Sequence, residues 1–176
     1  MNMSSQSLDR LFVERARDYL GNEYPAKLRR TLQALPPDKL WWRPNQESNS
    51  VGNLLLHLNG NLRQWIVAGV GGEVFDRHRA AEFAAREGAP AADLLEALEQ
   101  TLADVDRTLK GLSPARLAER CAIQGRELTV LDAVFHVTEH FAYHLGQIIL
   151  VTKMFAPGGV YFYEDAGGLA RPIWQQ

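Results

Sequence analysis

The stretch Thr129–Phe155, TVLDAVFHVTEHFAYHLGQIILVTKMF, carries apolar residues that recur every three or four positions. This spacing predicts a long amphipathic helix with one face toward a core. Thr129 is a suitable N-cap, and Pro157-Gly158-Gly159 predicts the end of the helix. A long helix with one apolar face needs partners to cover that face, so we searched the rest of the sequence for similar stretches.

Three further stretches show helical periodicity: Ser7–Ala34, Val51–Ala68 and Ala91–Leu112. Pro25 lies inside the first of them and is expected to kink or split that helix. Residues 75–88 are charged and are predicted to form an exposed, partly helical connection, and residues 119–127 an irregular segment. No strand alternation lasts long enough to predict a sheet. Four amphipathic helices predict an all-α fold, a four-helix bundle.

The length and charge of the chain indicate how many domains it forms and which kinds of partner it binds. Its 176 residues correspond to one domain, so residues 1–176 are expected to form a single helical domain, with 156–176 as a Gly- and aromatic-rich C-terminal tail. The net charge of −2 lacks the basic surface of a nucleic-acid binder. No secretory signal and no run of about 18 apolar residues is present. We therefore expect a cytoplasmic protein with a small-molecule partner, and neither nucleic acid nor membrane.

The aromatic cluster Tyr161-Phe162-Tyr163 lies in this tail among Gly and Pro residues. It could form a lid over a site or a dimer contact. Packing in the core or at an interface is the simpler expectation.

The histidines are the only concentrated metal-binding or proton-transfer groups, because a single cysteine, Cys121, excludes a multi-cysteine zinc site. His136, His140 and His144 are four residues apart and share one helical stripe. His144 is turned toward the apolar face, His140 lies at its edge and His136 lies furthest from it. His136 is therefore expected to line the pocket or to support a ligand rather than to bind the metal. The better pair of metal ligands is therefore His140 with His144. His78, in the charged connection, is expected in solvent.

His57 lies at the edge of the apolar stripe of the second helix. Three side-chain amides lie within about 40° of it on the helical wheel: Asn53, Asn61 and Gln64. Amides on an otherwise apolar helix suit the wall of a polar pocket. Gln147 could hydrogen-bond a ligand histidine, and Tyr143 could reach the mouth of the pocket.

Together with His140 and His144, His57 would supply a three-nitrogen site between two helices. Neutral imidazole is a good ligand for zinc and related metals, and a catalytic zinc takes three protein ligands and keeps one position open. Two alternatives to a catalytic metal site stay open. A lone histidine at a helix boundary is most often only hydrogen-bonded, and a metal held by these residues could lock the helices without any chemistry.

The segment His136–Ile148, HVTEHFAYHLGQI, resembles the closing helix of the DinB/YfiT-like superfamily of four-helix metalloenzymes. The mark of that helix is His-x-x-x-His followed by x-Gly-Gln-Ile. The segment Ser50–Leu58 resembles the second helix of the family, and Trp42-Arg43-Pro44 its lead-in. The resemblance spans about Leu8 to Phe155. It implies three ligands for a divalent transition metal, zinc first, with nickel, iron or manganese as alternatives: His57, His140 and His144.

The resemblance also implies a range of functions. Characterised members include thiol-dependent S-transferases that use bacillithiol or mycothiol, and a maleylpyruvate isomerase, and many members form homodimers. We therefore expect a metal-dependent enzyme acting on a small molecule, as an S-transferase or a metal-assisted hydrolase. The alternative is a non-catalytic metal- or ligand-binding stress-response protein with a structural histidine site. Since the chain has one cysteine, a reacting thiol would come from a cosubstrate of low molecular weight.

Overall fold

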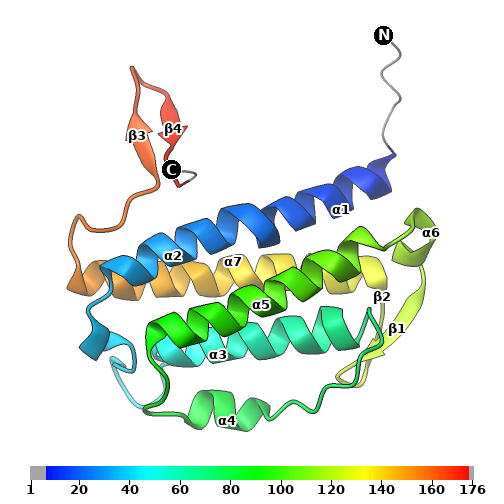
Figure 1. The fold of residues 1–176 in the computed structure, drawn as a ribbon, viewed down its shortest axis with the longest axis horizontal. Helices are drawn as coiled ribbons and strands as arrows, with labels where there is room; N and C mark the ends of the chain where they lie inside the picture. The colour runs from blue at the N-terminus through cyan, green and yellow to red at the C-terminus, as the bar shows by residue number, and fades with distance from the viewer. Residues whose placement is uncertain (1–6, 175–176) are drawn as a thin grey trace.

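The structure, a computed structural model that describes residues 7–174, is mostly helical (Figure 1). Its helices are α1 Leu8–Asp18, α2 Tyr24–Ala34, α3 Val51–Leu62, α4 Arg79–Ala84, α5 Ala91–Lys110, α6 Pro114–Leu117 and α7 Val130–Phe155. A π-helical segment, Tyr19–Glu23, joins α1 to α2, and a second one, Arg63–Ala68, extends α3. The predicted all-α class is confirmed. None of the described helices is both long and apolar enough to cross a membrane.

Four long rods form the bundle: α1 with α2, α3, α5, and α7 (Figure 1). The apolar pattern of α5 explains why this helix packs in the bundle. Its fully or nearly fully buried residues repeat at helical spacing: Leu98, Leu102, Val105 and Leu109. The helices α3 and α7 pack against each other. In addition, α3 packs against α5, and α7 packs against α2. This adjacency of α3 and α7 places the functional histidines.

The interruption expected at Pro25 takes the form of a π-helical segment. Tyr19–Glu23 keeps helical backbone angles, and Pro25 follows in the first turn of α2. Inside a continuous helix a proline removes one backbone hydrogen bond and crowds the preceding turn. The π-helical segment directly before Pro25 is where the regular α-helical hydrogen-bond pattern is interrupted. The rod therefore runs on through the proline.

Two small β-ribbons contradict the expectation that no strands form. In place of the predicted irregular segment, β1 Arg120–Ile123 pairs antiparallel with β2 Arg126–Thr129. The two-residue turn between them, Gln124-Gly125, has φ values of 53° and 72°, as a type I′ hairpin requires. Strands of four residues are too short for alternation to be read in a sequence, so the Gln-Gly turn was the only available signal.

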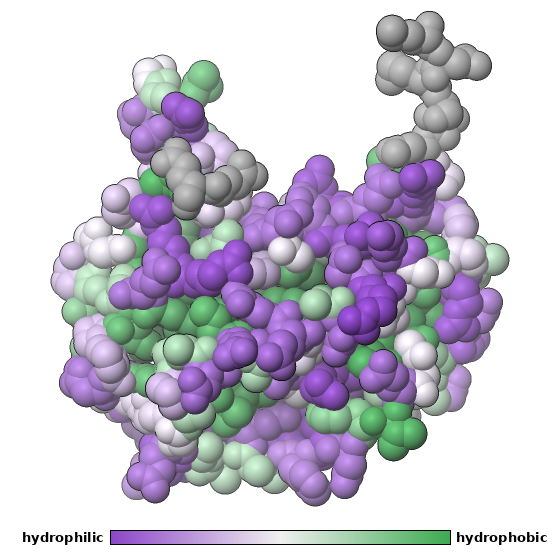
Figure 2. Space-filling model, in the orientation of Figure 1, coloured by the Kyte–Doolittle hydropathy of each residue, from purple (hydrophilic) through white to green (hydrophobic). Residues whose placement is uncertain are grey.

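The second ribbon belongs to the C-terminal tail and joins β3 Tyr163–Asp165 to β4 Ala170–Pro172. It stands out from the helical body (Figure 2). The tail is fastened to α2 by cations over aromatic rings: Lys27 Nζ lies 4.2 Å from the ring centroid of Trp174, and the Arg30 guanidinium lies 4.6 Å from that of Tyr161. The contacts that the tail aromatics make are thus packing contacts on α2.

Candidate metal centre

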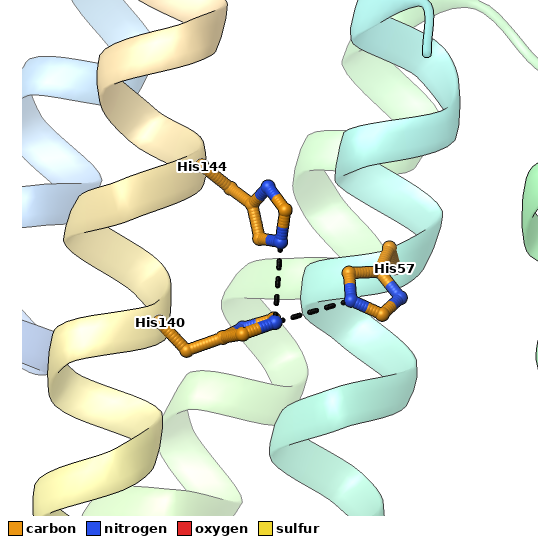
Figure 3. A group of neighbouring side chains, drawn as sticks. All are labelled: His57, His140 and His144. Carbon is orange, nitrogen blue, oxygen red and sulfur yellow. Dashed lines mark hydrogen bonds between the residues drawn. The ribbon is translucent and has the colours of Figure 1, made fainter. Parts of the chain in front are cut away.

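Three imidazoles from two helices converge at one point (Figure 3). His57 comes from α3, and His140 and His144 come from successive turns of α7. The Nε2 atom of His140 lies 3.1 Å from Nε2 of His57 and 3.1 Å from Nε2 of His144. One ring nitrogen from each residue lies within 4.8 Å of the other two. This is the trio that the helical wheels and the family resemblance both selected.

Local structure on each helix explains why the rings meet. Residues four apart on a helix lie on one face, so the two rings of α7 stand one above the other with centroids 4.4 Å apart. On α3, a capping box between Ser50 and Asn53 defines the first turn, one turn before His57. His57 and His144 are buried, and His140 is half-buried.

Hydrogen bonds orient two of the three rings. The Nδ1 atom of His144 lies 2.8 Å from Oε1 of Gln147, and Nδ1 of His57 lies 2.9 Å from Oε2 of Glu82. Both oxygens are acceptors, so each Nδ1 carries the proton and each Nε2 presents a lone pair. Arg77 Nη2 also lies 3.0 Å from His57 Nδ1. A bare nitrogen 2.9 Å from a carboxylate would be repelled, so donation from Nδ1 to Glu82 is the consistent assignment.

This arrangement fits a metal ion better than it fits hydrogen bonding alone. Two Nε2 lone pairs, of His57 and His144, face the Nε2 atom of His140. A single proton on that nitrogen can satisfy one lone pair and not both. A cation between the three nitrogens accepts all three lone pairs, and neutral imidazole is a common ligand for divalent transition metals. The donor set therefore fits such an ion.

Burial keeps two of the three rings, those of His140 and His144, neutral. Burial, and after it the neighbouring His144 and His57, lowers the pKa of His140 to about 3. Burial also lowers the pKa of His144, against the opposing effect of its hydrogen bond with Gln147. A protonated ring cannot ligate a metal, so rings that stay neutral at pH 7 are ready to bind one.

An ion pair that sequence reasoning missed supports His57. Arg77 donates from Nε to Oε1 of Glu82 at 2.7 Å and from Nη2 to Oε2 at 2.7 Å, and the two side chains are 3% and 11% exposed. Burial raises the pKa of Glu82, but hydrogen bonds from Arg77 and His57 outweigh it and leave that pKa below its usual value. The carboxylate that holds His57 is therefore charged.

The expectation that residues 75–88 form an exposed connection is thus wrong for Arg77 and Glu82. His78 between them is exposed, as expected. A charged segment is normally solvated, and the sequence does not show that two of its charges pair with each other and with a histidine. The only signal was weak: Phe75 and Phe83 lie among the charges.

The four amide side chains predicted to lie near the histidines have different roles. Gln147 hydrogen-bonds a ring of the trio, as expected. Gln64 accepts from Arg77 Nη1 at 3.0 Å and so supports the ion pair rather than the rings. Asn53 accepts from the backbone N–H of the N-cap Ser50 with Oδ1, and its Nδ2 donates to the carbonyl oxygens of Glu82 and Ala85 at the end of α4. Asn61 is buried, and none of the ring contacts given above involves it.

His136 and Tyr143 flank the trio. The His136 ring packs on Trp65 with centroids 4.1 Å apart and lies 5.3 Å from the His140 ring. It is therefore half-buried, although the helical wheel places it furthest from the core. Tyr143 is 63% exposed, and its ring meets the His144 ring edge-on at 5.1 Å.

The single cysteine stands apart from the trio. Cys121 is half-buried on β1, and burial raises the pKa of its thiol. A thiol with a raised pKa is a poor nucleophile at neutral pH. Its half-buried place on β1 suits a packing role.

Comparisons with known proteins agree with the fold. A family model described as "Protein of unknown function (DUF1572)" matches residues 7–160. Among solved structures, a DinB-like protein from Bacillus subtilis is similar with a TM-score of 0.63 and 16% identity, over 85% of this chain and 97% of that one. No curated protein matches the sequence. The likeness confirms the predicted DinB-like fold and, at this identity, shows the fold alone.

Proposed function

The chain belongs to the DUF1572 family, and from the geometry of its histidines we propose that it is a metal-dependent enzyme that acts on a small molecule. The metal is a divalent transition metal, with zinc as the first choice. His57, His140 and His144 hold it through their Nε2 atoms. The observation that carries this proposal is that two of these nitrogens have lone pairs fixed toward the third by Glu82 and Gln147.

A three-nitrogen ligand set suits catalysis more than a purely structural role. Structural zinc sites are closed by four protein ligands, whereas catalytic sites have three and leave a position for water or substrate. In that position the ion would supply Lewis-acid activation of a thiol or a water at neutral pH. Glu82 and Gln147 orient the rings of His57 and His144. The exposed ring of Tyr143 beside His144 lies where a small molecule could approach.

We propose that the reacting thiol is a cosubstrate of low molecular weight. The raised pKa of Cys121 argues against a nucleophile from the chain itself. The test is to supply zinc-loaded protein with bacillithiol, mycothiol or glutathione and an electrophilic acceptor. We expect thiol consumption that needs both the metal and His140. Hydrolysis without a thiol would favour the hydrolase reaction, and tight metal binding without either activity would favour the non-catalytic alternative.

Glu82→Gln is expected to weaken zinc binding about 10- to 100-fold, since loss of a group that orients a ligand histidine has effects of this size. The amide accepts a weaker hydrogen bond from His57 than the carboxylate does, so the ring is less basic and less firmly held. Competition titration with a zinc-binding dye measures the change. Glu87→Gln, an exposed position in the same segment, is the matched control. Equal affinities for the two variants would contradict the assigned role of Glu82.

We also propose that two copies pair through the outer face of α7. Four large apolar side chains on this one helix are 41–65% exposed: Leu131, Phe135, Leu150 and Met154. An antiparallel pair with its two-fold axis at Gly146 would bring Glu139 opposite the partner's Lys153 at both ends. A Cβ added to Gly146 would meet nothing within 4 Å, so the backbones are free to approach closely there.

Gly146→Cys in a Cys121→Ser background is expected to form a disulfide between two chains under mild oxidation, because a residue on a two-fold axis faces its own copy. Ala142→Cys in the same background is the control. In the antiparallel pair, residue 142 and its copy would lie about 12 Å apart along the helix axis, which is too far for a disulfide. Cross-linking of both variants at similar rates, or of neither, would contradict this pairing.

A further inference from the structure

The six-residue helix α4 is held by polar contacts at both of its ends. A helix this short is not stable by itself in water. Its N-terminal side is fixed by the buried ion pair of Arg77 with Glu82. We call residues 77–85 the α4 strap, because they lie across α3 and bring Glu82 to His57.

The C-terminal end of the strap is clasped by two side chains from outside it. The last carbonyl groups of a helix have no partner within the helix. Here Asn53 Nδ2 donates to the carbonyl oxygens of Glu82 and Ala85 at 2.8 and 2.9 Å. Arg43 Nη2 lies 2.9 Å from the carbonyl oxygens of Phe83 and Ala85, and it also donates to Asn53 Oδ1 at 2.6 Å. The clasp thus ties the strap to the first turn of α3.

The α4 strap packs against α3 at a glycine, Gly60, which we call the seat of the strap. Gly60 lies three residues after His57 and therefore on the same side of α3. A Cβ at this position would clash with Glu82 Oε1 and would lie 2.9 Å from Arg77 Nε. Glycine in a helix interior is normally less favourable than alanine. Its presence here is explained by the close approach of the ion pair to the backbone of α3.

We propose that the clasp, formed by Arg43 and Asn53, and the seat, Gly60, set the orientation of the His57 ring without contacting it directly. Arg43, Asn53 and Gly60 are positioning residues: they hold the strap, the strap places the Glu82 carboxylate, and the carboxylate fixes His57 with its proton on Nδ1. None of the contacts described for Arg43 or Gly60 is with an imidazole, so their effect passes through Glu82. The consequence for metal affinity rests on the metal binding proposed above. The consequence for the ring tautomer does not.

Gly60→Ala tests the seat, with Gly21→Ala in the π-helical segment before α2 as the matched control, since a Cβ there meets nothing within 4 Å. Arg43→Met tests the clasp and leaves α3 and Gly60 intact, so the inference stays testable if Gly60→Ala does not fold. Asn53→Ala is unsuitable because it also removes one half of the capping box of α3, the hydrogen bond that Asn53 accepts from the N-cap backbone. Two readouts are taken: the tautomer of His57 in metal-free protein, from long-range ¹H–¹⁵N spectra of ¹⁵N-histidine-labelled chain, and zinc affinity by dye competition.

We expect the wild type and Gly21→Ala to hold the His57 proton on Nδ1. In Gly60→Ala and Arg43→Met this preference is lost and zinc affinity falls about 10- to 100-fold. In a Glu82→Gln background the same two changes should have little further effect on affinity. An unchanged tautomer in both variants would overturn the inference, even if zinc affinity fell. If the wild type binds no zinc while the tautomer responds as described, the metal proposal fails and the positioning role stands.

Discussion

His140→Ala is expected to lower zinc affinity more than about 100-fold, because loss of a ligand exceeds the 10- to 100-fold effects of the groups that orient ligands. His140 is the central ring of the trio: its Nε2 lies 3.1 Å from both of the other Nε2 atoms. Without it, His57 and His144 remain as two nitrogens without a shared neighbour. Competition titration with a zinc-binding dye measures the loss.

Two other histidines serve as controls for this experiment. His78→Ala removes an exposed imidazole from the segment before α4 and should leave affinity unchanged. His136→Ala removes the ring one turn before His140, which packs on Trp65. It should lower affinity less than His140→Ala does, because His136 faces Trp65 and not the other Nε2 atoms. If His140→Ala kept its affinity within about threefold of the wild type, the assigned ligand set would be wrong.

Arg77→Met is expected to lower the free energy of unfolding of the metal-free protein by about 3–5 kcal/mol, the usual loss when one partner of a buried ion pair is removed. Glu82 would remain buried and charged with only His57 as a hydrogen-bond donor to its carboxylate. Urea denaturation at pH 7 measures the change. Arg107→Met breaks an exposed pair with Asp104 and should change stability by less than about 1 kcal/mol. Similar small losses for both variants would contradict the buried pair.

The pH dependence of this loss has a defined sign. The folded protein holds the pKa of Glu82 below its usual 4.5. A group with a lowered folded pKa stabilises the fold above its unfolded pKa, and this stabilisation is lost as pH falls through the folded pKa. In Arg77→Met the burial of Glu82 is no longer offset by Arg77, so its carboxylate takes up a proton at higher pH. The stability difference between wild type and variant should therefore shrink as pH falls toward 4.

The helices and the trio could be predicted because their signals are local. Residues four apart share a helix face whatever the rest of the chain does, so His140 and His144 could be paired from the sequence. His57 needed a second inference, that its helix packs against α7. Its place at the edge of an apolar stripe favoured that packing, and the structure brings the three rings together.

The groups that hold the trio could not be predicted because their partners are distant in the sequence. Glu82 contacts a histidine 25 residues away, and Arg43 contacts Phe83 and Ala85 about 40 residues away. A charge in a polar segment has the same local pattern whether it is solvated or buried in an ion pair. The sequence gives no signal for Gly60 either, because a glycine inside a helix does not by itself show a close approach: Gly146 lies inside α7, and an added Cβ there meets nothing within 4 Å.

The short β-ribbons were missed for a different reason. Strands of three or four residues hold too few positions for alternation to stand out from chance. The turn Gln124-Gly125 carries more information than either strand beside it, since both of its residues have positive φ. A Gln-Gly pair is a weaker signal than the Asn-Gly or Asp-Gly pairs typical of such turns.

The central claim is that the three imidazoles bind one divalent transition metal ion. The most direct measurement is elemental analysis of untagged protein after zinc titration and removal of free metal. The geometry predicts about one equivalent of zinc per chain, and retention that is lost in His140→Ala. Less than about a tenth of an equivalent of any transition metal, with no uptake on titration, would contradict the claim.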